Sequence, residues 1–418
     1  GGDTGERGFV DALGKFGPAE SILVKEITYA QYQQAMALKS IRAEFSYAIP
    51  MGDFCSNFKM KKAQSYDAIE AVTAIGYSVI DGGKSLFICD GKNQKYYWLD
   101  GADNKDDGSS PGMGFSALID SIEARGYSIY YPISIYLSAL GVKNDSLVPL
   151  AIEANLKNLP FRQDLYSYQT EKISALAERF FGRNFDFVRR ITEESGTVIY
   201  MYGYGQNVLT VNTDGSIEYK EEQSGGRTEQ SFTEALKTAM GFVASHGSWG
   251  PLEENGKSLY LKAAVPYPNK DKGYRFVFGM EVSGSPLYYE EGDPIVVEVT
   301  YGQVTYYKRH VINFDPEDIK AVEAGTGDKE TLSAVNVIAQ NYQYIYDTLL
   351  LTGEINAAVN QSVTFEDVAS LVNSMQIGYL KQADREITEI RPVWGVRMND
   401  TEIYFDLYTA EPVGYSAG

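Results

Sequence analysis

Few residues in this 418-residue sequence have the types and spacing that enzymatic chemistry needs. Residues 108–112 read Gly-Ser-Ser-Pro-Gly, which matches the pattern of a serine nucleophile on a sharp strand-to-helix turn. That turn requires an apolar strand directly before it, but residues 103–107 are Asp-Asn-Lys-Asp-Asp. The two histidines, His246 in a Gly/Ser-rich turn and His310 beside Arg309 in a predicted strand, favour surface or structural roles over a catalytic triad. We therefore expect no serine hydrolase site.

Motifs for bound ions and phosphates are also incomplete. Residues 103–108 have the acidic character of a calcium loop, but Lys105 occupies the third ligand position and Gly114 stands where a bidentate glutamate belongs. Residues 82–85, Gly-Gly-Lys-Ser, are similar to a phosphate loop. They join two predicted strands, however, so no helix N-terminus would face a phosphate. Two His and two Cys supply little material for a metal site, and we expect neither a metal nor a cofactor.

Adjacent carboxylates occur at four places, but adjacency in sequence does not place two carboxyl groups across a cleft, as a glycosidase requires. The four pairs are Glu193-Glu194, Glu221-Glu222, Glu253-Glu254 and Glu290-Glu291. Adjacent charges at strand ends and turns are normally solvated. The sequence therefore predicts a protein that is not an enzyme.

Composition limits the partners. Lys and Arg number 37 against 56 Asp and Glu, which gives a net charge of −19 and a pI near 4.6. A field of that sign repels phosphates, so we expect no nucleic acid and no anionic lipid as partners. No run of about 18 apolar residues is present. Cys55, in the loop after a predicted strand, and Cys89, in a strand, are expected to be two buried thiols and not a disulfide.

Tyrosine is the compositional anomaly, with 32 Tyr against 19 Phe and 3 Trp. Many tyrosines stand in adjacent pairs on predicted strands, where neighbouring residues point to opposite faces of the sheet. One tyrosine of each pair can therefore be part of the core while the other covers the outer face. Ordinary sheet packing is one interpretation, and exposed protein-interface anchors are the other. The candidate interface residues are Tyr97, Tyr131, Tyr202, Tyr289 and Tyr307.

The elements that must position these residues follow a recurring order, in which a helix precedes antiparallel strands and a glycine turn. The N-terminal part is expected to contain strands at 21–27 and 43–49 with a helix at 29–38 between them. A meander of strands at 77–80, 86–89 and 96–99 follows, and then a helix at 115–124 and an extended segment at 127–137. Later helices are expected at 173–181, 232–243, 331–351 and 365–375. The strands that follow these helices are expected at 197–202, 208–211, 217–219, 259–265, 274–280, 295–300, 304–307, 392–397 and 403–408.

This order predicts an α+β protein with several domains, in which antiparallel β-meanders have helices packed on one face. Length favours two or three domains. We expect an N-terminal α+β domain over 1–160, a helix-plus-meander domain over 161–315 and a second such domain over 316–418.

At this point the sequence resembles a known family, the YycH/YycI-type extracytoplasmic regulators of the WalK (YycG) sensor histidine kinase of Gram-positive bacteria. Residues 41–50 ahead of the meander resemble the opening of YycH, and the middle region of YycH resembles residues 175–180, 194–196, Tyr200 and 214–217, with residues 274–276 through 302–304 fitting it too. Residues 392–396 and 404–409 resemble its closing strands, although Ala410 stands where the family more often has Gly.

The resemblance implies a non-catalytic module outside the cell, held to the cell membrane by an N-terminal transmembrane helix that would precede this sequence. It also implies two partners, the ectodomain of the sensor histidine kinase and a paralogous regulator, and thereby a role in controlling cell-envelope metabolism. The family offers no catalytic residues to carry over to this chain.

The sequence is compatible with two classes of function. The first is the interaction module, and the second is a secreted envelope-carbohydrate hydrolase or ligand-binding protein with a dispersed polar site. Convergent buried carboxylates would favour the second class, whereas broad Tyr-lined sheet faces would favour the first.

Overall fold

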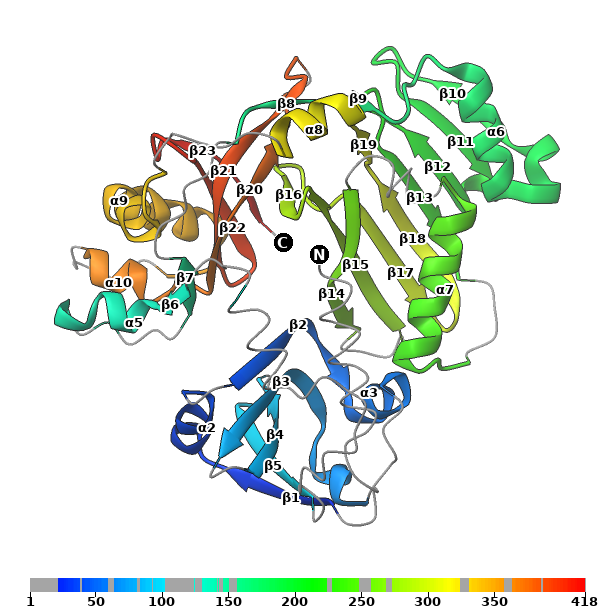
Figure 1. The fold of residues 1–418 in the computed structure, drawn as a ribbon. Helices are drawn as coiled ribbons and strands as arrows, with labels where there is room; N and C mark the ends of the chain where they lie inside the picture. The colour runs from blue at the N-terminus through cyan, green and yellow to red at the C-terminus, as the bar shows by residue number, and fades with distance from the viewer. Residues whose placement is uncertain are drawn as a thin grey trace. The chain divides into compact units, whose positions relative to one another are not determined.

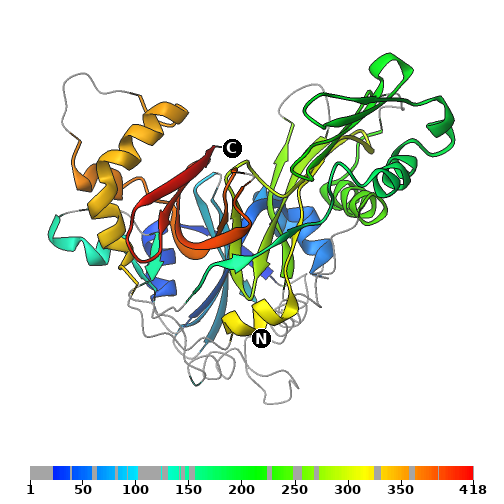
Figure 2. The same ribbon diagram turned by 90° about the horizontal axis from the view of Figure 1, so that it is seen from above.

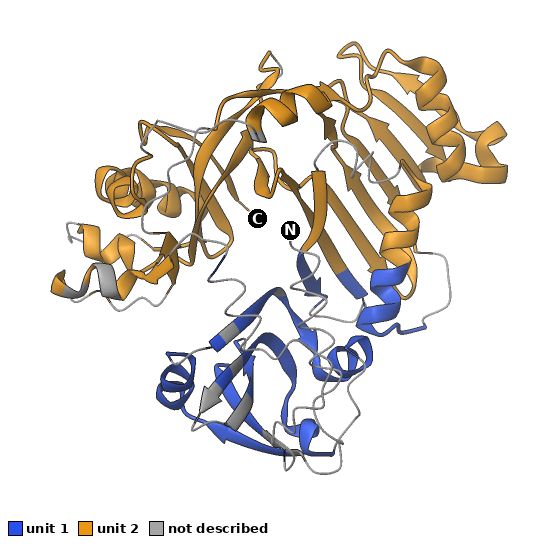
Figure 3. Ribbon diagram, viewed as in Figure 1, with its two compact units in different colours: residues 1–127, 227–237, 262–274 blue, residues 128–226, 238–261, 275–418 orange. Residues whose placement is uncertain are grey.

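The fold is seen in a computed structural model of the chain. The structure describes residues 22–37, 40–58, 64–80, 83–91, 93–101, 124, 130–140, 142, 146–149, 156–223, 228–247, 257–267, 273–323, 331–356, 363–384 and 386–417. It divides into two compact units, which Figure 3 colours separately. Unit 1 contains residues 1–127, 227–237 and 262–274, and unit 2 contains residues 128–226, 238–261 and 275–418. The domain boundaries at 160 and 315 stay predictions.

Unit 1 is built on a five-stranded antiparallel sheet with the order β1-β5-β4-β3-β2 (Figure 1). The strands are β1 (Ile22–Ile27), β2 (Ser40–Pro50), β3 (Ala71–Ile80), β4 (Gly83–Asp90) and β5 (Lys95–Gly101). The helices are α2 (Tyr29–Met36), α3 (Met51–Asn57) and the 3-10 turn η2 (Gln64–Ala68).

The two faces of this sheet are covered by different helices. Along β4, Leu86 packs in the cluster that contains Phe54 of α3, while its neighbour Phe87 packs with Tyr32 of α2. This is the period of two that a pleated strand imposes on its side chains. Thr28 caps the N-terminus of helix α2. Its side chain accepts a hydrogen bond from the backbone N–H of Gln31, and the Gln31 side chain completes a capping box.

Unit 2 is built on a 14-stranded sheet whose main path is β10-β11-β12-β13-β18-β17-β15-β16-β20-β21-β22-β23. Its first strands are β10 (Arg189–Thr192), β11 (Val198–Tyr202), β12 (Asn207–Val211), β13 (Ile217–Glu221), β15 (Gly273–Val282), β16 (Ser285–Tyr289), β17 (Ile295–Thr300) and β18 (Gln303–Arg309). Its last strands are β20 (Ser374–Lys381), β21 (Glu389–Met398), β22 (Thr401–Asp406) and β23 (Pro412–Ala417). The pair β16–β20 is parallel, and the other pairs with a described register are antiparallel.

Short strands and turns complete the described elements. The strands are β6 (Tyr130–Pro132), β7 (Leu147–Pro149), β8 (Leu159–Pro160), β9 (Arg162–Gln163), β14 (Lys257–Pro266) and β19 (Ile312–Asn313). The remaining helical segments are α5 (Ile133–Tyr136), η3 (Ser138–Leu140), η4 (Gly182–Phe187) and η5 (Gly203–Gly205). β9 pairs with β19, and this pairing brings Asp164 close to Asn313.

Helices α6 (Thr170–Phe181) and α7 (Phe232–Ser245) lie on the same face of the strands around β13 and β18 (Figures 1 and 2). The ring of Phe180 lies 4.8 Å from that of Tyr219 and 5.9 Å from that of Phe242, and Phe242 in turn lies 5.3 Å from Tyr307. Aromatic rings at these separations contribute both buried area and favourable edge and face contacts. This helix-plus-meander arrangement is the one that the sequence pattern predicted.

The last strands have their own helical cover. Helix α9 (Ala334–Thr352) and α10 (Phe365–Ala369) share a core with β20–β22, and α8 (Pro316–Glu323) precedes them in the chain. Trp394 is the largest fully buried side chain of this core, and its indole N–H donates to the carbonyl of Leu332 at 3.1 Å. A buried indole needs such an acceptor.

The structure confirms the α+β class and the antiparallel meanders, and it corrects several elements. The helix expected over 365–375 ends at Ala369, because residues 374–381 form a central strand. Cys55 lies in helix α3 instead of a loop, and both cysteines are buried thiols. The segment 127–137 contains the helix α5 after a short strand. The helix expected over 115–124 lies outside the described residues, apart from residue 124.

Candidate functional site

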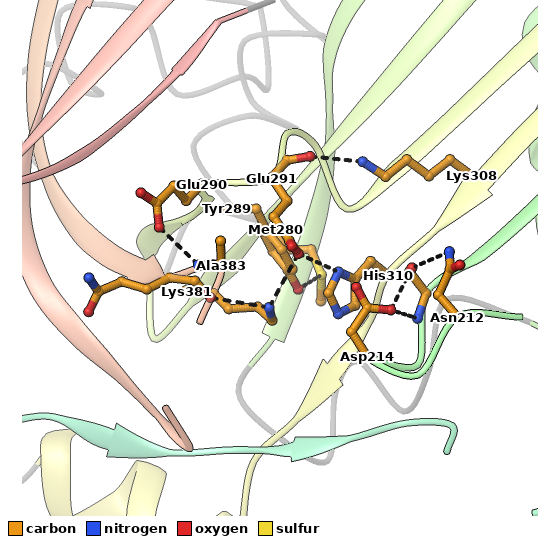
Figure 4. Close-up of polar contacts among 12 residues, drawn as sticks. Asn212, Asp214, Met280, Tyr289, Glu290, Glu291, Lys308, His310, Lys381 and Ala383 are labelled. Carbon is orange, nitrogen blue, oxygen red and sulfur yellow. Dashed lines mark hydrogen bonds and ion pairs between the residues drawn. The ribbon is translucent and has the colours of Figure 1, made fainter. Parts of the chain in front are cut away.

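The chemically richest part of the described structure is a polar cluster of unit 2, drawn in Figure 4. Its members come from three segments that are far apart in sequence. Asp214 lies in the turn between β12 and β13, Glu291 follows β16, and His310 follows β18. One ligand-type atom from each of these residues lies within 4.8 Å of the other two. We call Asp214, Glu291 and His310 the carboxylate–histidine cluster.

Asp214 is held by its own turn. Its Oδ1 accepts hydrogen bonds from the backbone N–H of Ser216 at 2.9 Å and from the Ser216 hydroxyl at 2.7 Å. Burial alone would raise the pKa of Asp214, but these hydrogen bonds hold its pKa below the usual value. Asp214 is therefore ionised at neutral pH.

Glu291 is held through the backbone around it. Its carbonyl accepts a hydrogen bond from Lys308 Nζ at 3.0 Å, and the preceding residue, Glu290, bonds through its carboxylate to the N–H of Ala383 at 2.9 Å. The N–H of Glu290 also donates to the carbonyl of Lys381 at 3.1 Å. These bonds extend the parallel pairing of β16 with β20 and fix the direction in which Glu291 leaves the sheet.

His310 is the buried member of the cluster, with a side chain only 3% exposed. Its Nδ1 lies 3.9 Å from Oε2 of Glu291, and its Nε2 has no hydrogen-bond partner among the residues that the structure describes. Burial and, in the same direction, the charge of Lys381 together lower the pKa of His310 to about 4, against the opposing effect of the Asp214 carboxylate. The imidazole is therefore neutral at physiological pH, with one nitrogen lone pair available.

Lys381, the last residue of β20, supplies the positive charge of this region. Its side chain is 5% exposed, and its Nζ lies 3.9 Å from Oε2 of Glu291. The same Nζ lies 5.9 Å from the ring centroids of Phe161 and Tyr289, within the range of cation–π attraction. An ammonium group so far from water needs these partners.

A second buried network adjoins the cluster. The side chain of Arg309 is 3% exposed and pairs with Asp164 at 2.7 Å. Lys257 Nζ donates to the carbonyl of Ile312 at 3.0 Å and to Oδ1 of Asn313 at 2.7 Å, and burial lowers the pKa of Lys257 to about 8. Asn313 Nδ2 donates to Asp164 at 2.9 Å. This network ties the segment 162–165, which we call the covering segment, to β18 and β19.

His246, the other histidine, has a structural role, as the sequence indicated. Its two ring nitrogens lie 2.9 Å from the carbonyl oxygen of Phe242 and 3.1 Å from that of Arg179, so the ring joins α7 to the end of α6. Burial lowers its pKa.

The five tyrosines proposed from sequence lie in different environments. Tyr97, Tyr289 and Tyr307 are buried, whereas Tyr131 is exposed and Tyr202 is half-buried. A buried ring cannot anchor a partner on the surface, so the expectation that these three are exposed is corrected. An interface role for Tyr131 and Tyr202 stays a prediction.

Pleat parity explains the correction. In the pairs 96–97 and 306–307 the first tyrosine is the more exposed one, the reverse of our choice. Alternation along a strand indicates that the two rings point to opposite faces, but not which face is covered. Tyr288 and Tyr289 are both buried, because β16 lies inside the sheet and packs on both sides.

The three most exposed aromatic side chains of the described residues were not selected from sequence. Tyr204 is fully exposed, and Phe187 and Tyr168 are each about three-quarters exposed, at 76% and 75%. The signal for Tyr204 was present in the sequence Gly203-Tyr204-Gly205, since glycines on both sides favour a turn that projects its central side chain. For Phe187 and Tyr168 we find no local signal.

Of the motifs rejected from sequence, the described structure includes residues 83–85, which belong to strand β4. Residues 102–112, with the serine pattern and the acidic loop, lie outside the described residues. Among the residues that the structure describes, no helix has the length and apolar character to cross a membrane.

No protein-family model matches the chain, and no curated protein matches it in sequence. Among solved structures, the chain is similar to the crystal structure of YycH from Bacillus subtilis, with a TM-score of 0.49 and 14% identity over 90% of this chain and 84% of that one. It is also similar to an uncharacterized protein from Eubacterium rectale, with a TM-score of 0.37 and 16% identity over 64% and 90% of the two chains. The C-terminal domain of YpeB from Bacillus megaterium gives a TM-score of 0.28 and 10% identity over 59% and 96%.

Proposed function

We propose that this protein is a non-catalytic interaction module that acts outside the cell, anchored to the cell membrane, and regulates a two-component sensor histidine kinase of the cell envelope. Its partners in this proposal are the kinase ectodomain and a paralogous regulator. The residues quoted above for the resemblance to the YycH/YycI family support the proposal, and so does one feature of the surface.

That feature is the group of aromatic side chains at one end of the β10–β12 meander, which we call the aromatic tip and which consists of Phe187, Tyr202 and Tyr204. The register pairs Arg189 with Met201 and Tyr202 with Asn207. Phe187, two residues before β10, and Tyr204, two residues after β11, therefore lie at the same end of the sheet. Exposed aromatic rings grouped in this way are typical anchors of protein interfaces.

The backbone supports outward projection of Tyr204. This residue has a φ of 56°, in the left-handed region that costs a side-chain-bearing residue about 1–2 kcal/mol. Gly203 and Gly205 on either side also have positive φ. Because the ring of Tyr204 is exposed, this backbone strain is not offset by packing in the core. The strain therefore favours a role for Tyr204 in contact with another molecule.

The carboxylate–histidine cluster bears on the alternative, a hydrolase of envelope carbohydrates. Asp214 and Glu291 do converge, but the ligand-type atoms of the cluster all lie within 4.8 Å of one another and Lys381 stands beside them. A glycosidase holds its two carboxyl groups about 5–9.5 Å apart on opposite sides of a sugar bond. The geometry of the cluster therefore favours a bound ion over a bound sugar.

The proposal is tested by co-expressing the full-length protein with the candidate kinase and crosslinking them in the membrane, where confinement raises the effective concentration of both. The double variant Phe187→Ser/Tyr204→Ser should lose most of the crosslinked product. Leu351→Ser is the matched control, because Leu351 is 73% exposed at the end of α9 and lies outside the aromatic tip. Equal crosslinking of the double variant and wild type would contradict the proposed interface, and hydrolysis of an envelope polymer by the pure protein would contradict the whole proposal.

A further inference from the structure

We propose that Asp214, Glu291 and His310 form a binding site for a divalent transition-metal cation of the zinc class. Each residue offers one ligand atom, and these atoms lie within 4.8 Å of one another. Two carboxylates and one imidazole are a ligand set that zinc accepts, with a further position left for water. Calcium is disfavoured, because it takes six to eight oxygen ligands and the cluster supplies an imidazole.

The observation that points to a ligand is His310. Figure 4 shows its ring between the carboxylates of Glu291 and Asp214. The side chain is 3% exposed, and within the described part of the chain its Nε2 has no hydrogen-bond partner, which is unfavourable for a polar atom removed from water. Coordination would give the buried Nε2 a partner that none of the described residues supplies.

The three ligands are held in place before any metal arrives. Asp214 is fixed by two hydrogen bonds from Ser216, and the N–H of His310 donates to the carbonyl of Pro294 at 2.6 Å. The carbonyl of Glu291 is fixed by Lys308. Outer contacts of this kind commonly tune the affinity of a metal site.

Lys381 has a defined part in this proposal. Its ammonium group lies 3.9 Å from the same Oε2 of Glu291 that faces His310, so it balances the carboxylate charge when no metal is bound. A divalent cation must compete with this charge at short range. Lys381 therefore weakens the site, and its removal should strengthen metal binding.

The experiment measures Zn²⁺ affinity of the tag-free chain by competition with a chromophoric chelator, together with the shift of the melting temperature on adding Zn²⁺. A Cys55→Ser/Cys89→Ser background excludes binding by thiols. We expect one Zn²⁺ per chain. His310→Gln should weaken binding by more than the roughly 10–100-fold that loss of an outer contact costs, and Lys381→Met should strengthen it about tenfold.

The chain offers a matched control, because it has only one other histidine. His246→Gln removes a buried imidazole that already has two carbonyl partners, and it should leave the Zn²⁺ affinity unchanged. Asp214→Asn and Glu291→Gln carry the same test should His310→Gln fail to fold. Zn²⁺ affinity that is equal in wild type and in all three ligand variants would overturn the proposal, and so would an equal loss in His246→Gln.

Discussion

The two turns at the ends of strand β12 differ in what covers them and in where they place their central side chains. The turn before it, residues 203–206, projects Tyr204 into water, whereas the turn after it, residues 212–216, places Asp214 in the carboxylate–histidine cluster. Both join antiparallel strands of one meander, and both contain glycine with positive φ. They differ in what lies over them, since the covering segment 162–165 packs on the second turn and its Leu165 carbonyl contacts Gly215. Whether the side chain of such a turn is exposed to water or placed in a polar cluster therefore depends on whether another segment packs over the turn.

The largest effect is expected from breaking what holds the covering segment. Asp164→Ala would leave Arg309 buried without its carboxylate partner, which costs about 3–5 kcal/mol. Arg162→Ala is the matched control, because Arg162 lies on the same segment and its exposed pair with Asp315 contributes about 0–1 kcal/mol. Urea unfolding of both variants measures the difference. Equal losses would show that the covering segment is not held by the buried pair.

The two glycines test the covered and uncovered turns directly. Gly215→Ala adds a Cβ that overlaps the Leu165 carbonyl at a φ of 81°, and we expect a loss of about 3 kcal/mol in the free energy of unfolding. Gly205→Ala, at a φ of 101° with no atom within 4 Å of the added Cβ, should cost only the backbone strain of about 1–2 kcal/mol. The comparison fails if Gly205→Ala is the more damaging change.

The pH dependence of stability should report on Lys257, which belongs to the buried network that holds the covering segment. Lys257 has a pKa of about 8 in the folded chain against 10.5 when solvated, so between these values the unfolded chain binds more protons. Stability of the wild type should therefore rise with pH from 8 to 10.5 relative to Lys257→Met, by about 3 kcal/mol in total, and this gain is lost as the pH falls to 8. Titration of tyrosines cancels in this difference. A flat difference between the two proteins would place the Lys257 ammonium in a solvated environment.

The smallest stability effect is expected at the uncovered turn. Tyr204→Ala should change the free energy of unfolding by less than about 0.5 kcal/mol, because its ring is fully exposed. In the membrane crosslinking assay the same variant should nevertheless lose product. A large loss of stability would assign Tyr204 to the core and remove the main support for the aromatic tip.

Much of the fold could be predicted from local pattern. The meander of β3–β5 and the strands β11–β13 follow from alternation and from Asp-Gly and Gly-Gly turns, and α6 follows from its apolar face and the Gly182 stop. Strand β20 could not be predicted in this way. The expected helix over 365–375 reaches only the first two residues of this strand, and its remaining buried residues gave no strand signal, because a central strand with both faces covered lacks the alternation that identifies a strand.

The class of the protein, the positions of most meanders and a surface or structural role for His246 could be predicted from the sequence. Tertiary structure alone decided the carboxylate–histidine cluster, because Asp214, Glu291 and His310 are brought together by the pairing of β13 with β18 and the end of β16. It also decided which tyrosine of each pair is buried. Local sequence sets the period of a strand, but the side that is covered depends on residues that pack there from elsewhere in the chain.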